Sequence, residues 1–200
     1  NSSSIPSILS TNAFNKGFTP NTVLFDLPTE FNTNCGPYGG GSGCYMPENY
    51  DGKNRGPMSL RAALAQSINV PAVKLFYLSG VNDSVRLAEN MGISTLVDPK
   101  RYGLSLVIGG GEVTLLDITS AYGVFANNGI KNSYTGILKI EDKNGKTLEE
   151  FKINEKNILP KNTALLISDI LSDNQSRIPT FGASSALVVS GYDVAAKTGT

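Results

Sequence analysis

The most informative stretch of this sequence is residues 55–74, which read Arg55-Gly56-Pro57-Met58-Ser59-Leu60-Arg61-Ala62-Ala63-Leu64-Ala65-Gln66-Ser67-Ile68-Asn69-Val70-Pro71-Ala72-Val73-Lys74. Leucine and alanine recur at helical spacing after Ser59, which can cap the first turn of a helix. The pattern stops at Ser67-Ile68-Asn69 and then resumes with Pro71, a residue that needs no N–H partner in a first turn. The stretch therefore predicts two helices joined by a short polar break.

The rest of the chain indicates more helices, one hairpin and a C-terminal strand. We expect little helix before Pro57, and helices from Asn82 to Gly92, from Thr114 to Asn127 and from Lys161 to Leu171. Asn144-Gly145 lies between two β-like runs, residues 137–141 and 147–153, and predicts a hairpin. A last strand is expected to lead into residues 194–200. These elements give a helix-dominated α+β class without internal repeats.

Composition excludes several classes of function. The formal net charge is zero and the basic residues are scattered, which disfavours a nucleic-acid-binding surface. The chain has no histidine, so Ser-His-Asp catalysis and histidine-ligated zinc are excluded. No apolar run approaches the ~20 residues that span a bilayer, and residues 1–10 do not resemble a signal peptide. The two cysteines, Cys35 and Cys44, cannot form a four-cysteine metal site; a disulfide and two free thiols remain equally open.

Two short motifs carry candidate chemistry. In Ser67-Ile68-Asn69 the polar residues interrupt an apolar helical pattern, although helix capping explains them equally well. In Lys197-Thr198-Gly199-Thr200 an ammonium and two hydroxyls on one strand can bind a carboxylate, and Gly199 lets another backbone approach closely. A strand end rich in turn-forming residues is the ordinary alternative.

The two motifs in this order resemble the pattern of penicilloyl-serine transferases. The resemblance extends to the class A, bifunctional penicillin-binding proteins through residues 55–74 and three further stretches, Pro47–Lys53, Gly109–Asp117 and Ala121–Gly129. It covers residues 13–200, whereas residues 1–12 match poorly. It implies one partial transpeptidase domain over residues 1–200 with a β-lactamase/transpeptidase-like fold. The helical lobe and the K-T-G strand are present, and the strands that flank K-T-G in the family are missing.

The resemblance also implies a reaction. In the family an active-site serine attacks the D-Ala-D-Ala peptide carbonyl, and an amine from a second stem peptide resolves the acyl-enzyme. β-Lactams acylate the same serine. The implied partners are therefore stem peptides and β-lactams, without metal or organic cofactor.

Carried over by motif, Ser67 would relay a proton to the leaving amine, and Asn69 would bind the peptide backbone. Lys197 would supply positive potential for Ser67 and for the substrate carboxylate. The hydroxyls of Thr198 and Thr200 would bind the substrate carboxylate, and the Thr200 amide would form half of the oxyanion hole, which is often worth ~3 kcal/mol of barrier.

The nucleophile motif departs from the family. The family's serine lies in S-x-x-K, a pattern that this sequence lacks, and ungapped counting places it on Ser3-Ser4-Ile5-Pro6. Ser3 occupies the nucleophile position, whereas Pro6 replaces the lysine and is expected to disturb a helix. Three interpretations remain: residues 1–12 are a truncation or frameshift artefact, which we favour; the nucleophile lies upstream; or the base has been lost.

Two expectations concern activity and location. Because the strands that flank K-T-G in the family are missing, we expect the chain to be inactive by itself. The alternative class is a non-catalytic β-lactam sensor or peptidoglycan-binding domain, and a β-lactamase fits less well because no acidic motif marks a base for water. The family further implies a parent protein at the extracytoplasmic face of the bacterial membrane, held by an N-terminal anchor that this sequence does not include.

Overall fold

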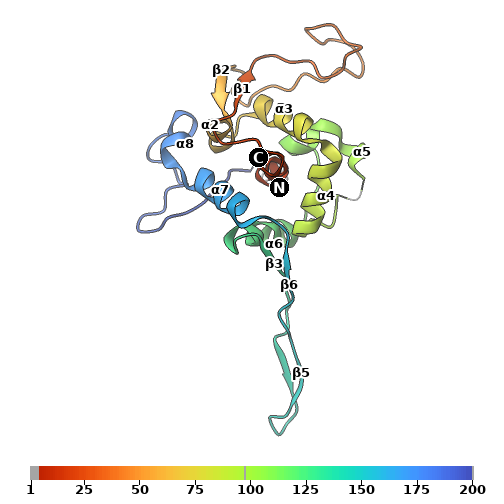
Figure 1. Ribbon diagram of the computed structural model, residues 1–200, viewed down its shortest axis with the longest axis vertical. Helices are drawn as coiled ribbons and strands as arrows, with labels where there is room; N and C mark the ends of the chain where they lie inside the picture. Colours follow the sequence, from red (N-terminus) through yellow and green to blue (C-terminus); the bar gives the residue numbers. More distant parts are fainter. Residues whose placement is uncertain (1–4, 97, 200) are drawn as a thin grey trace.

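A buried helix lies at the centre of the molecule (Figure 1). The computed structural model describes residues 5–96 and 98–199. Helix α1 (Ile5–Asn15) is buried from Ile5 to Phe14, and the other helices surround it. Its buried polar groups find partners inside the core: Asn12 Nδ2 donates to Ser79 O at 2.9 Å and to Ser84 Oγ at 3.1 Å. Such a helix is stabilised by packing on all sides rather than along one face.

The expectation that Pro6 disturbs a helix is wrong. Pro6 is the second residue of α1, in the first turn, where its missing N–H costs no hydrogen bond. Ile5–Asn12 are thus helical, although we expected little helix before Pro57. Ser3, the proposed nucleophile position, lies outside the described residues.

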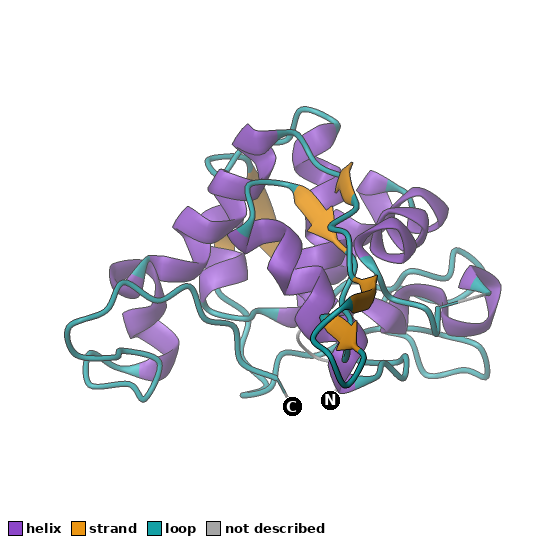
Figure 2. Cartoon of the chain, turned by 90° about the horizontal axis from the view of Figure 1, so that it is seen from below, coloured by secondary structure: helices purple, strands orange, loops and turns teal. Residues whose placement is uncertain are grey.

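The surrounding helices form most of the body (Figure 2). They are α2 (Leu60–Ala65), α3 (Asn69–Ser79), α4 (Val81–Met91), α5 (Pro99–Tyr102), the 3₁₀ helix η2 (Gly103–Ile108), α6 (Leu115–Ala126), α7 (Lys161–Ser172) and α8 (Asn174–Phe181).

The predicted break between α2 and α3 is confirmed, and Ser59 Oγ caps α2 by accepting from Ala62 N at 3.2 Å. The predicted start at Asn82 is wrong, because α4 begins at Val81 directly after Gly80. Thr114 caps α6 as predicted.

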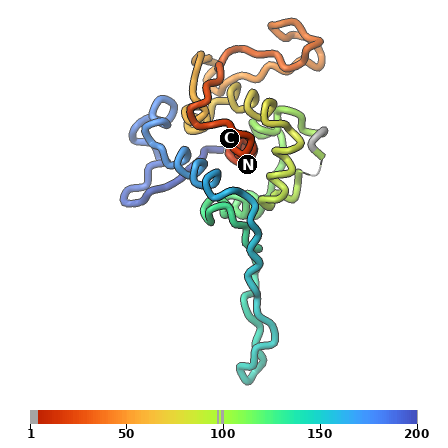
Figure 3. The backbone as a smooth tube through the Cα atoms, in the orientation of Figure 1, coloured from red at the N-terminus to blue at the C-terminus, as the bar shows by residue number. Residues whose placement is uncertain are grey.

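Three small antiparallel pairs make up the strand content of residues 5–96 and 98–199. β1 (Val23–Asp26) pairs with β2 (Gly56–Ser59), β3 (Ile130–Asn132) with β6 (Glu155–Asn157), and β4 (Lys139–Glu141) with β5 (Thr147–Glu150). The β4–β5 pair confirms the predicted hairpin and extends from the body as a long arm (Figures 1 and 3). None of these pairs forms a central sheet among the described residues, so helix packing holds the body together.

The predicted C-terminal strand is wrong for its described part. Residues 194–199 are extended but pair with no strand in the described chain, and a strand without a neighbour has no ladder to stabilise it. Their backbone is held instead by a helix end, because Ala196 N donates to Leu171 O at 2.9 Å. The chain returns here to the first turn of α1, where Lys197 and Pro6 line the same small cavity.

Candidate active site

The two sequence motifs meet in space. Lys197 Nζ donates a hydrogen bond to Ser67 Oγ at 2.7 Å, across 130 residues of sequence. The same ammonium donates to Thr198 O at 2.9 Å. The structure therefore brings Ser67 and Lys197 together as an amine–hydroxyl pair.

Ser67 has a backbone conformation that serines rarely adopt. Its φ is +59°, and among the described residues other than glycine only Asn128 also has a positive φ. The left-handed conformation costs roughly 1–2 kcal/mol for a residue with a Cβ. It closes the end of α2, where Ser67 N donates to Leu64 O at 3.2 Å and Ile68 N to Ala63 O at 2.9 Å. The hydroxyl that reaches Lys197 is thus presented from a tight turn between two helices.

Lys197 is partly buried. Burial lowers the pKa of its ammonium from 10.5 to about 8. Within the described residues no carboxylate lies at ion-pair distance from it. At pH 7 the group is still mostly protonated and donates to Ser67, whereas slightly above pH 8 much of it is a neutral amine that can accept a proton.

A groove of about 650 Å³ opens beside this pair. Ser67, Asn69, Thr198 and Gly199 from the two motifs line it, and so does Pro6. Pro6 therefore lies in the groove that contains Ser67, and it carries no titratable group there. The volume of the groove is in the range of sites for small ligands or short peptides. Thr200 lies outside the described residues, so its predicted roles have no geometry here.

Asn69 contacts the wall of the groove. Its side-chain Nδ2 donates to Glu48 O at 2.9 Å, which leaves one amide hydrogen and the amide oxygen for a ligand. The side chain of the neighbouring Asn49 caps the start of α3: its Oδ1 accepts from Asn69 N at 3.0 Å and from Val70 N at 3.1 Å. Asn69 is thereby fixed both through its side chain and through its backbone.

The Asn49–Asp26 pair supports the groove, and it was not predicted from the sequence. Asn49 Nδ2 donates to both carboxylate oxygens of Asp26, at 2.8 and 2.9 Å. Asp26 is fully buried and also accepts from Arg55 N at 2.8 Å. A buried carboxylate with several donors keeps a loop in one position. Residues 47–53 resembled the family, but no local pattern indicated that Asn49 reaches Asp26.

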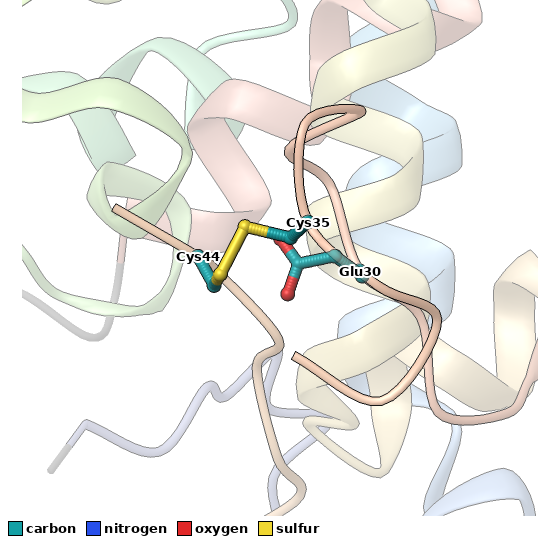
Figure 4. Close-up of side chains that lie close together, drawn as sticks. All are labelled: Glu30, Cys35 and Cys44. Carbon is teal, nitrogen blue, oxygen red and sulfur yellow. A yellow bond between two sulfur atoms is a disulfide. The ribbon is translucent and has the colours of Figure 1, made fainter. Parts of the chain in front are cut away.

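Glu30, Cys35 and Cys44 lie together in the loop before α2 (Figure 4). Cys35 and Cys44 form a disulfide, which selects one of the two alternatives that the sequence left open. Neither sulfur is therefore a free thiolate, the form that binds metals. Glu30 Oε1 accepts from Asn32 N at 2.8 Å and from Tyr45 N at 2.7 Å. The cluster stabilises the loop rather than offering a set of metal ligands.

A family model described as penicillin binding protein transpeptidase domain matches residues 8–200. The chain belongs to the penicillin-binding protein transpeptidase family. Relatives place this transpeptidase domain among those of the class A proteins. Penicillin-binding protein 1A of Clostridium acetobutylicum is 31% identical over 185 residues, which cover 91% of this chain and 22% of the relative. Penicillin-binding protein 1A of Aquifex aeolicus is 38% identical over 156 residues, 78% of this chain and 20% of the relative. The chain thus spans about a fifth of the length of these relatives.

Solved structures show the same fold for this transpeptidase domain. Penicillin-binding protein 1A from Haemophilus influenzae superposes with a TM-score of 0.75 at 24% identity, over 88% of this chain and 29% of that one. A ceftriaxone acyl-enzyme complex of penicillin-binding protein A from M. tuberculosis gives a TM-score of 0.79 at 18% identity, over 99% of this chain and 46% of that one. The expected α+β, β-lactamase/transpeptidase-like class is confirmed. None of the described helices has both the length and the apolar character to cross a membrane.

Proposed function

We propose that this transpeptidase region serves acyl transfer between peptidoglycan stem peptides through a serine acyl-enzyme. The hydrogen bond from Lys197 Nζ to Ser67 Oγ, beside the 650 Å³ groove, carries the proposal. Family membership supports this reaction class, and penicillin-binding protein A from M. tuberculosis, which has the same fold, forms an acyl-enzyme complex with ceftriaxone.

The residues of the two motifs have separate roles in the proposed reaction. A serine hydroxyl adds to the carbonyl of the penultimate D-Ala, the peptide C–N bond breaks, and the terminal D-Ala amine leaves with a proton relayed by Ser67. An acceptor amine then attacks the ester and releases the serine. Lys197 orients Ser67 and attracts the terminal carboxylate of the peptide, Asn69 binds the peptide backbone, and the hydroxyls of Thr198 and Thr200 bind the carboxylate.

We further propose that this 200-residue chain is not catalytically competent by itself. Ser3 occupies the nucleophile position by counting, and Pro6 takes the place of the lysine that would serve as its base. Pro6 lines the groove beside Ser67 and has no amine. Serine is a weak nucleophile without an adjacent base.

Labelling with a fluorescent penicillin, followed by peptide mass spectrometry, tests both proposals. The unaltered chain is expected to remain unlabelled. A strand-extended Pro6→Lys variant, joined to the strands that flank K-T-G in a class A relative, is expected to become acylated at Ser3. Stoichiometric labelling of the unaltered chain would overturn the proposed incompetence. A folded, strand-extended Pro6→Lys variant that stays unlabelled would count against acyl transfer at this groove.

Non-covalent recognition of β-lactams or peptidoglycan is the second candidate function, and the position of Pro6 favours it. Amide donors line the groove and Lys197 contacts Ser67 beside it, whereas Pro6 supplies no base for acylation. Reversible binding of penicillin, measured by calorimetry and weakened by Lys197→Met, is the expected result for this function.

We propose that the parent protein acts at the extracytoplasmic face of the bacterial membrane. The Cys35–Cys44 disulfide supports this placement, since such bonds persist in oxidising compartments.

A further inference from the structure

Arg177 is a buried cation whose hydrogen-bond acceptors are carbonyl oxygens. It lies on α8 and is only 2% exposed. Its Nη2 donates to Leu171 O, and its Nη1 donates more weakly to Leu187 O at 3.4 Å. Within the described part of the chain no carboxylate comes within ion-pair distance of it. Burying a guanidinium in this way is costly, so the contacts that it makes need an explanation.

Leu171 O lies at the C-terminal end of α7. The last carbonyls of a helix have no partner within the helix, and positive charge is favourable at that end. Arg177 supplies both a donor and the charge. The same oxygen accepts the amide of Ala196 at 2.9 Å. Arg177 therefore fixes the acceptor that holds the residue directly before Lys197.

The contact with Leu187 O adds a second restraint on the same segment. Leu187 lies in the loop that leads from α8 to Lys197, and Arg177 is the side chain that bridges this loop and the end of α7. The guanidinium of Arg177 thus contacts both Leu187 O and Leu171 O, the oxygen that accepts from Ala196 N.

The helix that carries Arg177 is tied to the helix that precedes Ser67. Arg61 on α2 donates to Asp169, and its Nη1 donates to Asp173 at 3.0 Å. Asp173 in turn caps α8 by accepting from Ser176 N at 2.9 Å. Ion pairs and hydrogen bonds therefore connect α2 to α7 and α8, and Arg177 on α8 connects these helices to the residues that precede Lys197.

We infer that Arg177 is a positioning residue that holds Lys197 against Ser67, through the carbonyl of Leu171 and the amide of Ala196. The inference rests on the proposed function for its relevance to acyl transfer, although its geometry does not depend on that reaction. Without the guanidinium the segment of Lys197 loses its fixed acceptor, water reaches the amine, and the 2.7 Å contact with Ser67 loosens.

The midpoint of the pH titration of Lys197 tests the inference. Pulse labelling with acetic anhydride at pH 6–11, read for each lysine by peptide mass spectrometry, gives this midpoint without any acylation by penicillin. The unaltered chain is expected to titrate near pH 8 at Lys197. Arg177→Met is expected to raise the midpoint by at least one pH unit, towards the value of a hydrated lysine, about 10.4. A midpoint that stays near pH 8 in folded Arg177→Met overturns the inference.

Two further variants separate positioning from a general loss of stability. Val85→Ala removes a buried side chain of α4 and is expected to leave the midpoint of Lys197 unchanged. An equal shift in Val85→Ala and Arg177→Met would overturn the inference. Arg177→Lys keeps a cation that reaches one carbonyl, and is expected to shift the midpoint upward by less than Arg177→Met. If Arg177→Met does not fold, an unchanged midpoint in Arg177→Lys overturns the inference. A shifted midpoint in Arg177→Met, together with a folded, strand-extended Pro6→Lys variant that is never acylated, would contradict the proposed function and leave the positioning role intact.

Discussion

The two walls of the groove are built by different means. One wall is the first turn of α1, a helix buried in apolar surroundings that presents Pro6. The other wall is formed by Ser67 and Asn69. It is held by hydrogen bonds, by a strained turn and by the partly buried amine of Lys197, which contacts Ser67. The apolar wall keeps its helix with a proline at position 6. The comparison teaches that packing preserves the scaffold, whereas the chemistry depends on single side chains.

The largest effect on stability is expected in the apolar wall. Ile8 is fully buried in α1, so Ile8→Ala should lower the free energy of unfolding by about 3–4 kcal/mol at every pH. Leu148→Ala on the exposed hairpin arm is the control and should change it by less than about 0.5 kcal/mol. Urea denaturation measures both. Similar values for the two variants would show that α1 is not the centre of the core.

The polar wall is expected to respond to pH through Lys197. Its folded pKa, about 8, lies below the ordinary lysine pKa of 10.5, so the unfolded state binds more protons between these values. Stability should therefore rise with pH across this window, by up to about 3 kcal/mol relative to Lys197→Met, and the full cost of burial applies below pH 8. Denaturation of both proteins from pH 7 to 11 measures the difference. A constant difference would mean that Lys197 is hydrated in the folded chain.

A smaller effect on the free energy of unfolding is expected at Asn49, whose side chain supports the polar wall. Asn49→Ala removes donors from the buried carboxylate of Asp26 and the acceptor at the start of α3, and should cost about 2 kcal/mol. Asn54 is exposed and makes one long bond to Asp26, at 3.3 Å, so Asn54→Ala should cost less than about 1 kcal/mol. Thermal unfolding ranks the two variants, and equal losses would remove Asn49 from its proposed supporting role.

Local elements were the most predictable part of the fold. The α2–α3 break, the Thr114 cap and the Asn144-Gly145 hairpin follow from residues next to one another in sequence. Helix α1 escaped prediction because it is buried all round and shows no polar face. The C-terminal strand was predicted from its composition, but strands also need a partner, which no local pattern reports.

The site was predictable only in part, for the same reason. The pairing of Ser67 with Lys197 was inferred from the resemblance, because no periodicity connects residues 130 positions apart. The contacts of Asn49 with Asp26 and of Arg177 with Leu171 O are long-range or backbone contacts of ordinary polar residues. Their sequence neighbourhoods are equally consistent with exposed loop positions.

The rate of penicillin acylation in matched double variants tests the role of the Ser67–Lys197 pair. In the strand-extended Pro6→Lys background, Lys197→Met removes the amine that contacts Ser67, whereas Lys161→Met removes an exposed lysine at the start of α7. We predict that Lys197→Met lowers the rate at least about 100-fold, as for the loss of a major catalytic electrostatic contact, and that Lys161→Met leaves it unchanged. Equal rates in the two double variants would contradict a role for the Ser67–Lys197 pair in acyl transfer.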